Sequence, residues 1–271
     1  MAYISSNANR FYVAVEEAFG QVPQITAQNR FSAVQLSARQ QIESGQRNDK
    51  TGSRTFAGIS SGARRKTDFG VKTYLSSWQT GLAIPGHGPL FQAALGSDPL
   101  IFAGGIAGNS TNASQISFAS PHGLSVNQAV SFNSEIRFVA SIIDGTTVLL
   151  NAPFSLTPGP GAPFSPTVTY LPTTELPSIS LFDFWAPSAA VQRVISGAVV
   201  NQLSISVNGD FHEFQFRGAA RDILDSASFS PGDGGLATFP VEPTLTAFAQ
   251  SAVPGNLGQA WIGSTATRYM T

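Results

Sequence analysis

The chain has 271 residues, a formal net charge of −1 and no cysteine. The lack of cysteine excludes a disulfide framework, a thiol nucleophile and a zinc site with cysteine ligands, and it suits assembly in a reducing compartment. Hydrophobic residues make up 42% of the chain, with 20 Phe, so a packed core is expected and disorder of the whole chain is excluded. The length fits one large all-β domain or two smaller ones.

Charge is distributed unevenly along the chain. Up to residue 80 there are ten Lys/Arg against five Asp/Glu, and from residue 81 onward there are five against eleven. Such asymmetry fits head-to-tail packing of identical subunits, nucleic-acid contact by the basic end, or simply two solvated faces of opposite sign. The first ten residues lack a basic region and an apolar core, so no signal peptide is expected. We expect a soluble protein with no membrane partner, because no apolar stretch approaches roughly 20 residues.

Strand-like patterns dominate the first hundred residues. Residues 31–39 alternate over part of their length, and residues 65–75 place Phe69, Val71 and Leu75 on one face. The connection 40–64 is too long for a hairpin turn and is interpreted as an arm that reaches a neighbouring subunit. Residues 88–96 predict one short helix, with Pro near the start and Gly as the stop.

A second module is predicted from 109 to 163. Four short strands are expected there, at 115–120, 129–132, 136–143 and 147–150, followed by a Pro/Gly-rich linker at 158–163. This segment is interpreted as a small β insertion. The parent β domain is then discontinuous and consists of residues 1–108 and 164–271.

The parent domain resumes with strand candidates at 178–185, 197–207 and 211–218, the last two forming a hairpin around Asn208-Gly209. Residues 219–225 are interpreted as a helical turn and 259–262 as a final strand. The sequence therefore predicts an all-β fold, a sandwich or barrel with one short flanking helix, a long inter-strand arm and a small β insertion.

Motifs for catalysis find little support. Residues 58–62 match a nucleophile elbow around Ser60, but they lie in a polar loop rather than at a sharp strand-to-helix turn. The histidines are isolated from other ligand types, and the acidic residues near 210–225 are interpreted as a solvated surface rather than paired catalytic carboxylates. These residues are His87, His122, His212, Asp210, Glu213, Asp222 and Asp225. We therefore predict a structural protein that is not an enzyme, with no cofactor and no metal.

Basic residues concentrate in and after the long connection. An intersubunit salt-bridge surface is favoured over phosphate binding, because interleaved aromatics are missing apart from Phe56 and Phe69. The candidate contact residues between subunits or rings are Arg47, Lys50, Arg54, Arg64, Arg65 and Lys66.

The order of these parts resembles the tail tube proteins, or major tail proteins, of long-tailed bacteriophages with non-contractile tails. The entry strand 11–20 carries an acidic pair before a small residue and Gly, and 65–75 follows a long basic loop. Residues 90–96 resemble the family's short helix, and 197–203 with 216–218 resemble its late hairpin.

The resemblance implies a virion protein that is assembled in the host cytoplasm and located in the viral tail. Six-membered rings whose strands join into an inner β-barrel would stack into a hollow, helical tube that conducts DNA during ejection into the host. The implied partners are further copies of the chain, a tape measure protein, tail terminator and baseplate proteins, and genomic DNA in transit. A conduit for DNA should avoid a basic lumen, so the basic residues are expected in ring contacts and acidic residues in the channel.

Residues 109–157 depart from the minimal plan of that family. They resemble modules inserted in larger phage tail proteins, at 121–124 and 136–139, and are expected to decorate the exterior. A tube terminator, a baseplate component and a carbohydrate-binding or adhesin module therefore stay open as alternatives. An adhesin would expose aromatic residues in a groove, for which Trp78, Trp185 and Trp261 are the candidates.

Overall fold

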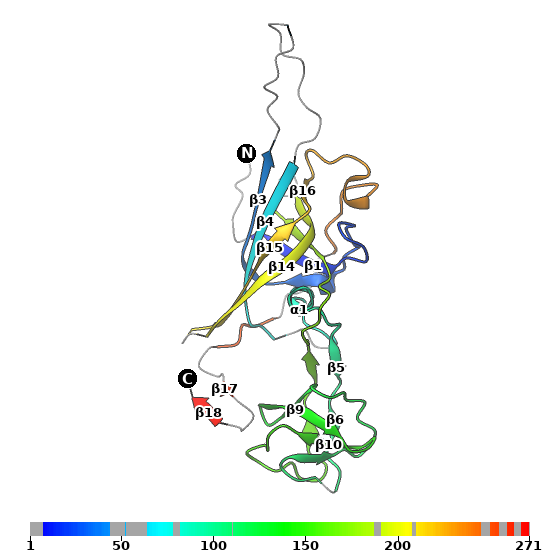
Figure 1. Cartoon of the computed structure of the whole chain (residues 1–271), viewed down its shortest axis with the longest axis vertical. Coiled ribbons are helices and arrows are strands. Elements are labelled where there is room, and N and C mark those ends of the chain that lie inside the picture. The colour runs from blue at the N-terminus through cyan, green and yellow to red at the C-terminus, as the bar shows by residue number, and fades with distance from the viewer. Residues whose placement is uncertain are drawn as a thin grey trace.

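The computed structural model describes residues 8–43, 52, 64–77, 82–109, 111–186, 191–207, 210–244, 250–254, 259–262 and 267–270. In this part of the chain almost all regular structure is β-strand, and α1 (Gly88–Leu95) is the one α-helix. The predicted all-β fold with one short helix is therefore confirmed. Figure 1 shows a larger module that contains α1 and a smaller one that is reached through β5.

The larger module is built on one sheet with the strand order β2-β1-β13-β14-β15-β4-β3, in which β16 also pairs with β14. All neighbouring strands are antiparallel. The strands are β1 (Arg10–Val15), β2 (Arg30–Phe31), β3 (Ala33–Glu43), β4 (Arg64–Tyr74), β13 (Ile179–Phe184), β14 (Arg193–Val207), β15 (His212–Ala220) and β16 (Asp222–Asp225).

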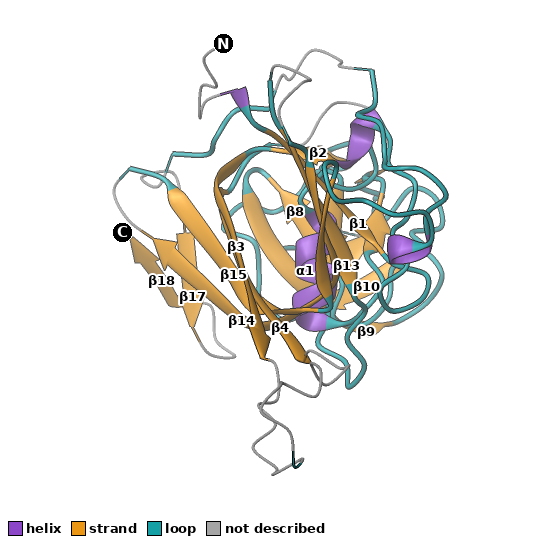
Figure 2. Cartoon of the chain, turned by 90° about the horizontal axis from the view of Figure 1, so that it is seen from above, coloured by secondary structure: helices purple, strands orange, loops and turns teal. Residues whose placement is uncertain are grey.

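Strand β14 belongs to two halves of this sheet. Its first residues, through Ala198, pair with β13 on one side and β16 on the other, whereas residues 199–207 pair with β15. Gly197, at the boundary, has a φ of +61°, a conformation that Gly adopts without a steric penalty. The sheet curls around α1, as Figure 2 shows from above.

Helix α1 fills the inner side of the curled sheet. Pro89 occupies its first turn and Gly96, with φ of +100°, ends it, as the sequence predicted. Leu90 and Ala93 are fully buried in the main core. The ring of Phe91 packs edge-on against two phenylalanines of β15, Phe214 and Phe216, with centroid distances of 5.1 and 5.3 Å.

A buried carboxylate lies where β1 meets β13 and β14. Glu16 is 6% exposed, and it accepts hydrogen bonds from the backbone N–H groups of Gly20 and Gly197, both at 2.7 Å. The hydroxyl groups of Ser178 and Ser180 donate two more, at 2.7 and 2.6 Å. Four donors therefore satisfy this charge without a cationic partner among them.

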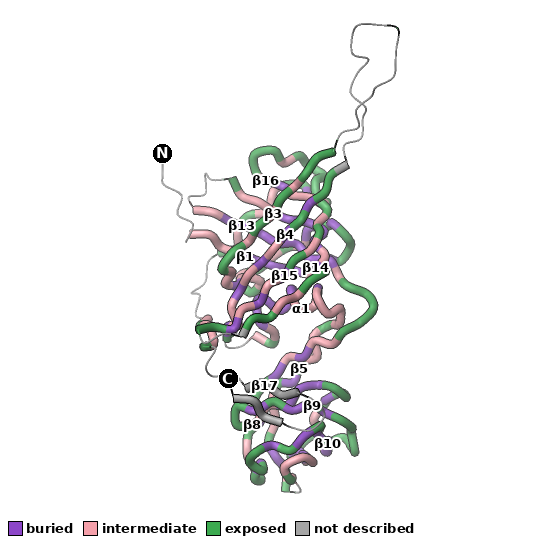
Figure 3. Tube along the Cα trace, turned by 60° about the vertical axis from the view of Figure 1, so that its left-hand side comes forward, coloured by how far each residue is buried: buried purple, intermediate pink, exposed green. Residues whose placement is uncertain are grey.

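The smaller module has a hydrophobic core of its own. Its members extend from Phe102 to Phe164 and include the fully buried Ile116, Val139 and Val148. The paired strands β5 and β12 belong to this module, although β5 precedes the predicted 109–163 segment and β12 follows it. Figure 3 shows its buried residues inside the module, separate from the larger sheet.

The strands of the smaller module form a four-stranded sheet of order β7-β10-β9-β8 and two short ladders, β5–β12 and β6–β11. They are β5 (Leu100–Phe102), β6 (Gly105–Ile106), β7 (Gln115–Ser117), β8 (Ala129–Phe132), β9 (Glu135–Ile142), β10 (Thr147–Leu150), β11 (Pro163–Phe164) and β12 (Thr167–Thr169). The strands expected at 129–132 and 147–150 are found with those bounds, β7 is shorter than the expected 115–120, and β9 is shifted by one residue from the expected 136–143.

Two sequence interpretations were wrong. Residues 219–225 form no helical turn, because β15 continues to Ala220 and β16 covers most of the remainder. Residues 40–43 and Arg64 do not belong to a loop, because β3 and β4 stay paired as far as Glu43 and Arg64. Polar side chains at these positions hid the strands, since one face of the sheet is exposed.

The remaining described elements are short. The predicted strand at 259–262 is β17 (Gln259–Ile262), which pairs with β18 (Thr267–Met270). Two 3₁₀ turns, η2 (Ala27–Asn29) and η3 (Asp233–Gly235), lie in loops of the larger module. The hairpin turn predicted at Asn208-Gly209 lies outside the described residues, although β14 and β15 pair as expected.

Candidate functional site

Four strands of the larger module, the second half of β14 together with β15, β4 and β3, form a sheet with two chemically different faces. Successive side chains of a strand alternate between faces. The face toward α1 carries buried apolar residues such as Phe69, Val71 and Phe216. The opposite face, which we call the polar face, carries Gln35, Ser37, Arg39, Gln41, Glu43, Lys66, Asp68, Gly70, Lys72, Gln202, Ser204, Ser206, Glu213, Gln215 and Arg217.

Both lateral edges of this four-stranded sheet are free in the described part of the chain. Strand β3 pairs only with β4, and β14 has no partner on its second side after Ala198. Each edge exposes an isoleucine: Ile42 on β3 is 62% exposed, and Ile205 on β14 is 58% exposed. Free edges with exposed apolar side chains are templates for pairing with another chain.

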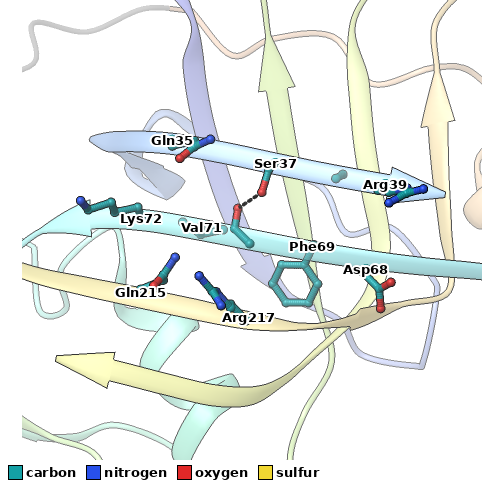
Figure 4. Close-up of a pocket in the computed structure, with 11 residues that line it drawn as sticks. Gln35, Ser37, Arg39, Asp68, Phe69, Val71, Lys72, Gln215 and Arg217 are labelled. Carbon is teal, nitrogen blue, oxygen red and sulfur yellow. Dashed lines mark hydrogen bonds between the residues drawn. The ribbon is translucent and has the colours of Figure 1, made fainter.

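A groove of about 390 Å³ crosses the polar face over β3, β4 and β15. Its centre is Gly70, whose cross-strand neighbours are Ser37 on β3 and Arg217 on β15. The Ser37 hydroxyl donates to the carbonyl oxygen of Gly70 at 3.3 Å. Figure 4 shows Arg39, Lys72 and Arg217 around this groove, together with the amide side chains of Gln35 and Gln215.

The cations of the polar face differ in their partners. Lys72 pairs with Glu213 at 2.7 Å, and Lys66 lies 3.9 Å from Asp68. Arg39 and Arg217 are exposed and form no ion pair with a described residue. The groove therefore keeps an excess of positive charge.

The predicted contact residues are only partly described. Arg65 pairs with Asp222 of the same chain at 2.7 Å, and Lys66 lies on the polar face. Arg64 is the first residue of β4. Arg47, Lys50 and Arg54 lie outside the described residues. The structure thus places Arg65 against β16 and Lys66 on the other face of β4, so these two side chains do not act as one cluster.

The residues that the sequence offered for catalysis or metal binding lie in different parts of the structure. His87 is buried before α1, and burial lowers its pKa to about 4. The His122 ring accepts a hydrogen bond from the Leu124 backbone N–H at 2.8 Å, within the smaller module. His212 is buried at the start of β15. Ser60 lies outside the described residues, and among those that are described no group of three or more His, Asp or Glu side chains is arranged to hold a metal ion.

The acidic residues near the end of β15 have partners in the same chain. Asp222 accepts from Gln40 and Arg65, both at 2.7 Å. Asp225 accepts from the backbone N–H and the hydroxyl of Ser228, and these bonds lower its pKa. Glu213 lies on the polar face with Lys72. These carboxylates therefore stabilise strands and turns within the chain.

Of the tryptophans, the structure describes the side chain of Trp185. It is half-buried, and the guanidinium of Arg193 lies over its ring at 6.0 Å. Trp78 and the side chain of Trp261 lie outside the described part of the structure. Trp185 is therefore engaged by a cation of its own chain.

Sequence reasoning did not single out the groove residues Arg39, Gly70 and Arg217. They lie on three strands that are far apart in the sequence, and only the strand pairing brings them together. One signal was available, because Gly70 interrupts an otherwise regular strand pattern.

Comparison with known proteins identifies no relative. No family model matches the chain, and no curated protein matches it. No helix among the described residues has the length and apolar character needed to cross a membrane.

Proposed function

We propose that the chain is the structural subunit of a phage tail tube, which assembles as stacked six-membered rings into a hollow conduit for DNA. The observation that carries the proposal is that, in the described part of the chain, both edges of one four-stranded antiparallel sheet are free. The resemblance of the sequence to tail tube proteins supplies the ring number and the biological setting.

The strand directions favour closure into a ring. Because each neighbouring pair from β14 to β3 is antiparallel, β14 and β3 run in opposite directions. When copies stand side by side in one orientation, β3 of one copy meets β14 of the next in antiparallel register. The contact uses two different surfaces, so repeating it by rotation closes a ring and leaves no free edge.

The polar face gives such a barrel a hydrated interior, because the opposite face is covered by α1 and the main core. In this arrangement β3 to β15 and the second half of β14 line the channel. The polar face carries Arg39, Lys66, Lys72 and Arg217 against Glu43, Asp68 and Glu213. This balance argues against the expectation that acidic residues dominate the lumen.

The remaining parts take supporting roles in the proposal. The basic contact candidates between β3 and β4, Arg47, Lys50 and Arg54, would bridge stacked rings, and the smaller module would decorate the exterior. The partners are further copies of the chain, a tape measure protein, terminator and baseplate proteins, and DNA in transit. The location is the virion tail, after assembly in the host cytoplasm.

A carbohydrate-binding or adhesin module is the second candidate, and a terminator or baseplate component is a variant of the first. An adhesin requires exposed aromatic side chains in a groove. The groove of the polar face is instead lined by charged, amide and hydroxyl side chains, and its one aromatic residue, Phe69, is 5% exposed.

Electron microscopy of the purified chain at high concentration tests the proposal. Hollow rings or tubes support it. Uniform monomers in the micrographs and in analytical ultracentrifugation favour the adhesin instead, and a single ring that never stacks favours a terminator. Binding to an array of glycans, measured on the same preparation, separates the adhesin from an inert monomer.

A further inference from the structure

Gly70 is a glycine that its backbone conformation does not require, and only the Ser37 hydroxyl crowds the position where a Cβ would stand. It lies in the middle of β4 between two paired strands, where Gly weakens a sheet because it adds no side-chain packing. Its φ is not in the left-handed region, and a Cβ would meet nothing closer than the Ser37 hydroxyl, at 3.1 Å. Gly218 differs, because a Cβ there would lie 1.9 Å from the carbonyl oxygen of Val199. Because position 70 has no side chain, the groove stays open there.

The groups around the open position are donors of hydrogen bonds and positive charge. Arg217 on β15 is the cross-strand neighbour of Gly70. Arg39 lies on β3, on the other side of β4, and is the cross-strand neighbour of Asp68. Both guanidinium groups are exposed without an ion pair to a described residue, and that of Arg217 donates to the side-chain amide oxygen of Gln215 at 3.0 and 3.2 Å. They are anchored on paired strands of a sheet, so little backbone ordering is needed when a ligand binds.

This chemistry fits a phosphate group. A guanidinium presents a planar fork of donors that matches phosphate oxygens in a bidentate contact. Two such groups on either side of an open glycine, with Lys72 nearby, suit a chain of phosphates better than one small anion. Among the described residues that line the groove, none offers an exposed ring on which a base could stack, which favours contact with the backbone of a duplex over single-strand recognition.

We propose that the groove over Gly70 binds the phosphate backbone of double-stranded DNA through Arg39 and Arg217, without sequence preference. The surface lies on one chain, so the inference goes beyond the proposed ring and does not require it.

The test measures binding of a fluorescent DNA duplex to the full chain by anisotropy over a series of salt concentrations. The groove variant is Arg39→Gln/Arg217→Gln. The matched control is Arg65→Gln/Arg221→Gln, which removes the same charge from side chains that do not line the groove. Gly70→Gln is the third variant, since it fills the groove and leaves the net charge unchanged.

We expect wild-type binding to weaken steeply with salt. The groove variant should bind about tenfold more weakly at low salt, and the slope of log K against log[salt] should fall by about 2, since two phosphate contacts are lost. Gly70→Gln should also bind more weakly, and the control should stay within about threefold of wild type. Equal losses in the groove and control variants, or no wild-type binding at low salt, would overturn the inference.

Sedimentation velocity in the same buffers reports assembly separately. Rings that form without DNA binding would show that the groove inference fails and the proposed tube stands. DNA binding by a chain that never forms rings would show the reverse. Circular dichroism verifies that each variant is folded. If the groove variant does not fold, Arg39→Lys/Arg217→Lys replaces it, because this variant keeps the charge and loses the bidentate fork. If the Lys variant binds DNA as tightly as wild type, the guanidinium contact is refuted.

Discussion

The backbone N–H of Gly197 donates a 2.7 Å hydrogen bond to the buried carboxylate of Glu16. Gly197 lies on β14 between Ser196, the last residue that pairs with β16, and Val199, the first that pairs with β15. Arg221, at the corresponding break between β15 and β16, donates its backbone N–H to the Ser196 carbonyl oxygen at 3.0 Å. A carboxylate directly after β1 therefore fixes the bend on which the curl of the sheet depends.

Glu16→Gln should destabilise the chain by roughly 2–4 kcal/mol, measured by urea unfolding. The amide nitrogen would face the backbone N–H of Gly20 or Gly197, which cannot accept a hydrogen bond, and bonds to a charged acceptor contribute about 1.5–3 kcal/mol each. The control is Glu17→Gln at the neighbouring, exposed position, with an expected change within about 0.5 kcal/mol. Equal unfolding midpoints for the two variants would show that Glu16 does not hold the bend.

Ile205→Lys should abolish ring formation and leave the single chain folded. The side chain is 58% exposed at the free edge of β14, and Lys at a sheet edge opposes pairing with another strand. The measurement is the sedimentation coefficient together with the unfolding free energy. The latter should change by less than about 0.5 kcal/mol.

Val241→Lys is the matched control for that experiment. Val241 is 86% exposed and lies outside the strands of the sheet, so the same change of residue should leave assembly intact. Rings formed by Ile205→Lys, or lost in both variants, would speak against the β14 edge as the contact.

His87 should make the stability of the chain depend on pH. Burial lowers its pKa from 6.5 to about 4, whereas the unfolded chain retains the ordinary value. The folded state keeps His87 neutral, so between pH 6.5 and about 4 only the unfolded chain takes up the proton. Stability is therefore fully present above pH 6.5 and falls with decreasing pH, by about 1.4 kcal/mol per unit.

His87→Phe removes the titrating group and retains a ring that can pack on Phe91, its neighbour at a centroid distance of 5.8 Å. The difference in unfolding free energy between wild type and variant, followed from pH 7 to pH 4.5, isolates the contribution of this one group. A constant difference across that range would exclude His87 as its source.

Glu135→Gln should destabilise the smaller module by about 3–5 kcal/mol. Glu135 pairs with Arg137, which is 2% exposed, so the variant leaves a buried cation without its counter-charge. Hydrogen exchange should accelerate in β7 to β10 and stay unchanged in the larger sheet, because the two modules have separate cores. Arg65→Gln, which breaks an exposed pair, should cost no more than about 1 kcal/mol.

Most strands could be predicted because their side chains alternate. Phe69 and Val71 lie on one face of β4, as expected, and the first residues of β9 also alternate between buried and exposed. The helix was evident from Pro89 and Gly96. Local sequence determined these features, so local reasoning was sufficient.

The missed features depend on long-range pairing. Residues 40–43 are largely polar, and they form a strand because β4 lies beside them. Residues 222–225 carry two aspartates, which are rare in strands, yet they pair with the first part of β14. The groove combines residues of β3, β4 and β15, whose proximity no single segment encodes.

The chain enters the smaller module through β5 and leaves it through β12, and these two strands are paired neighbours. The ends of the intervening segment are thus about one strand spacing apart, roughly 4.8 Å. A segment whose ends meet in this way can be excised, shortened or exchanged with only a short splice between residues 99 and 170. The larger sheet would keep its strand order, so the smaller module can vary in length and sequence without a change in the larger one.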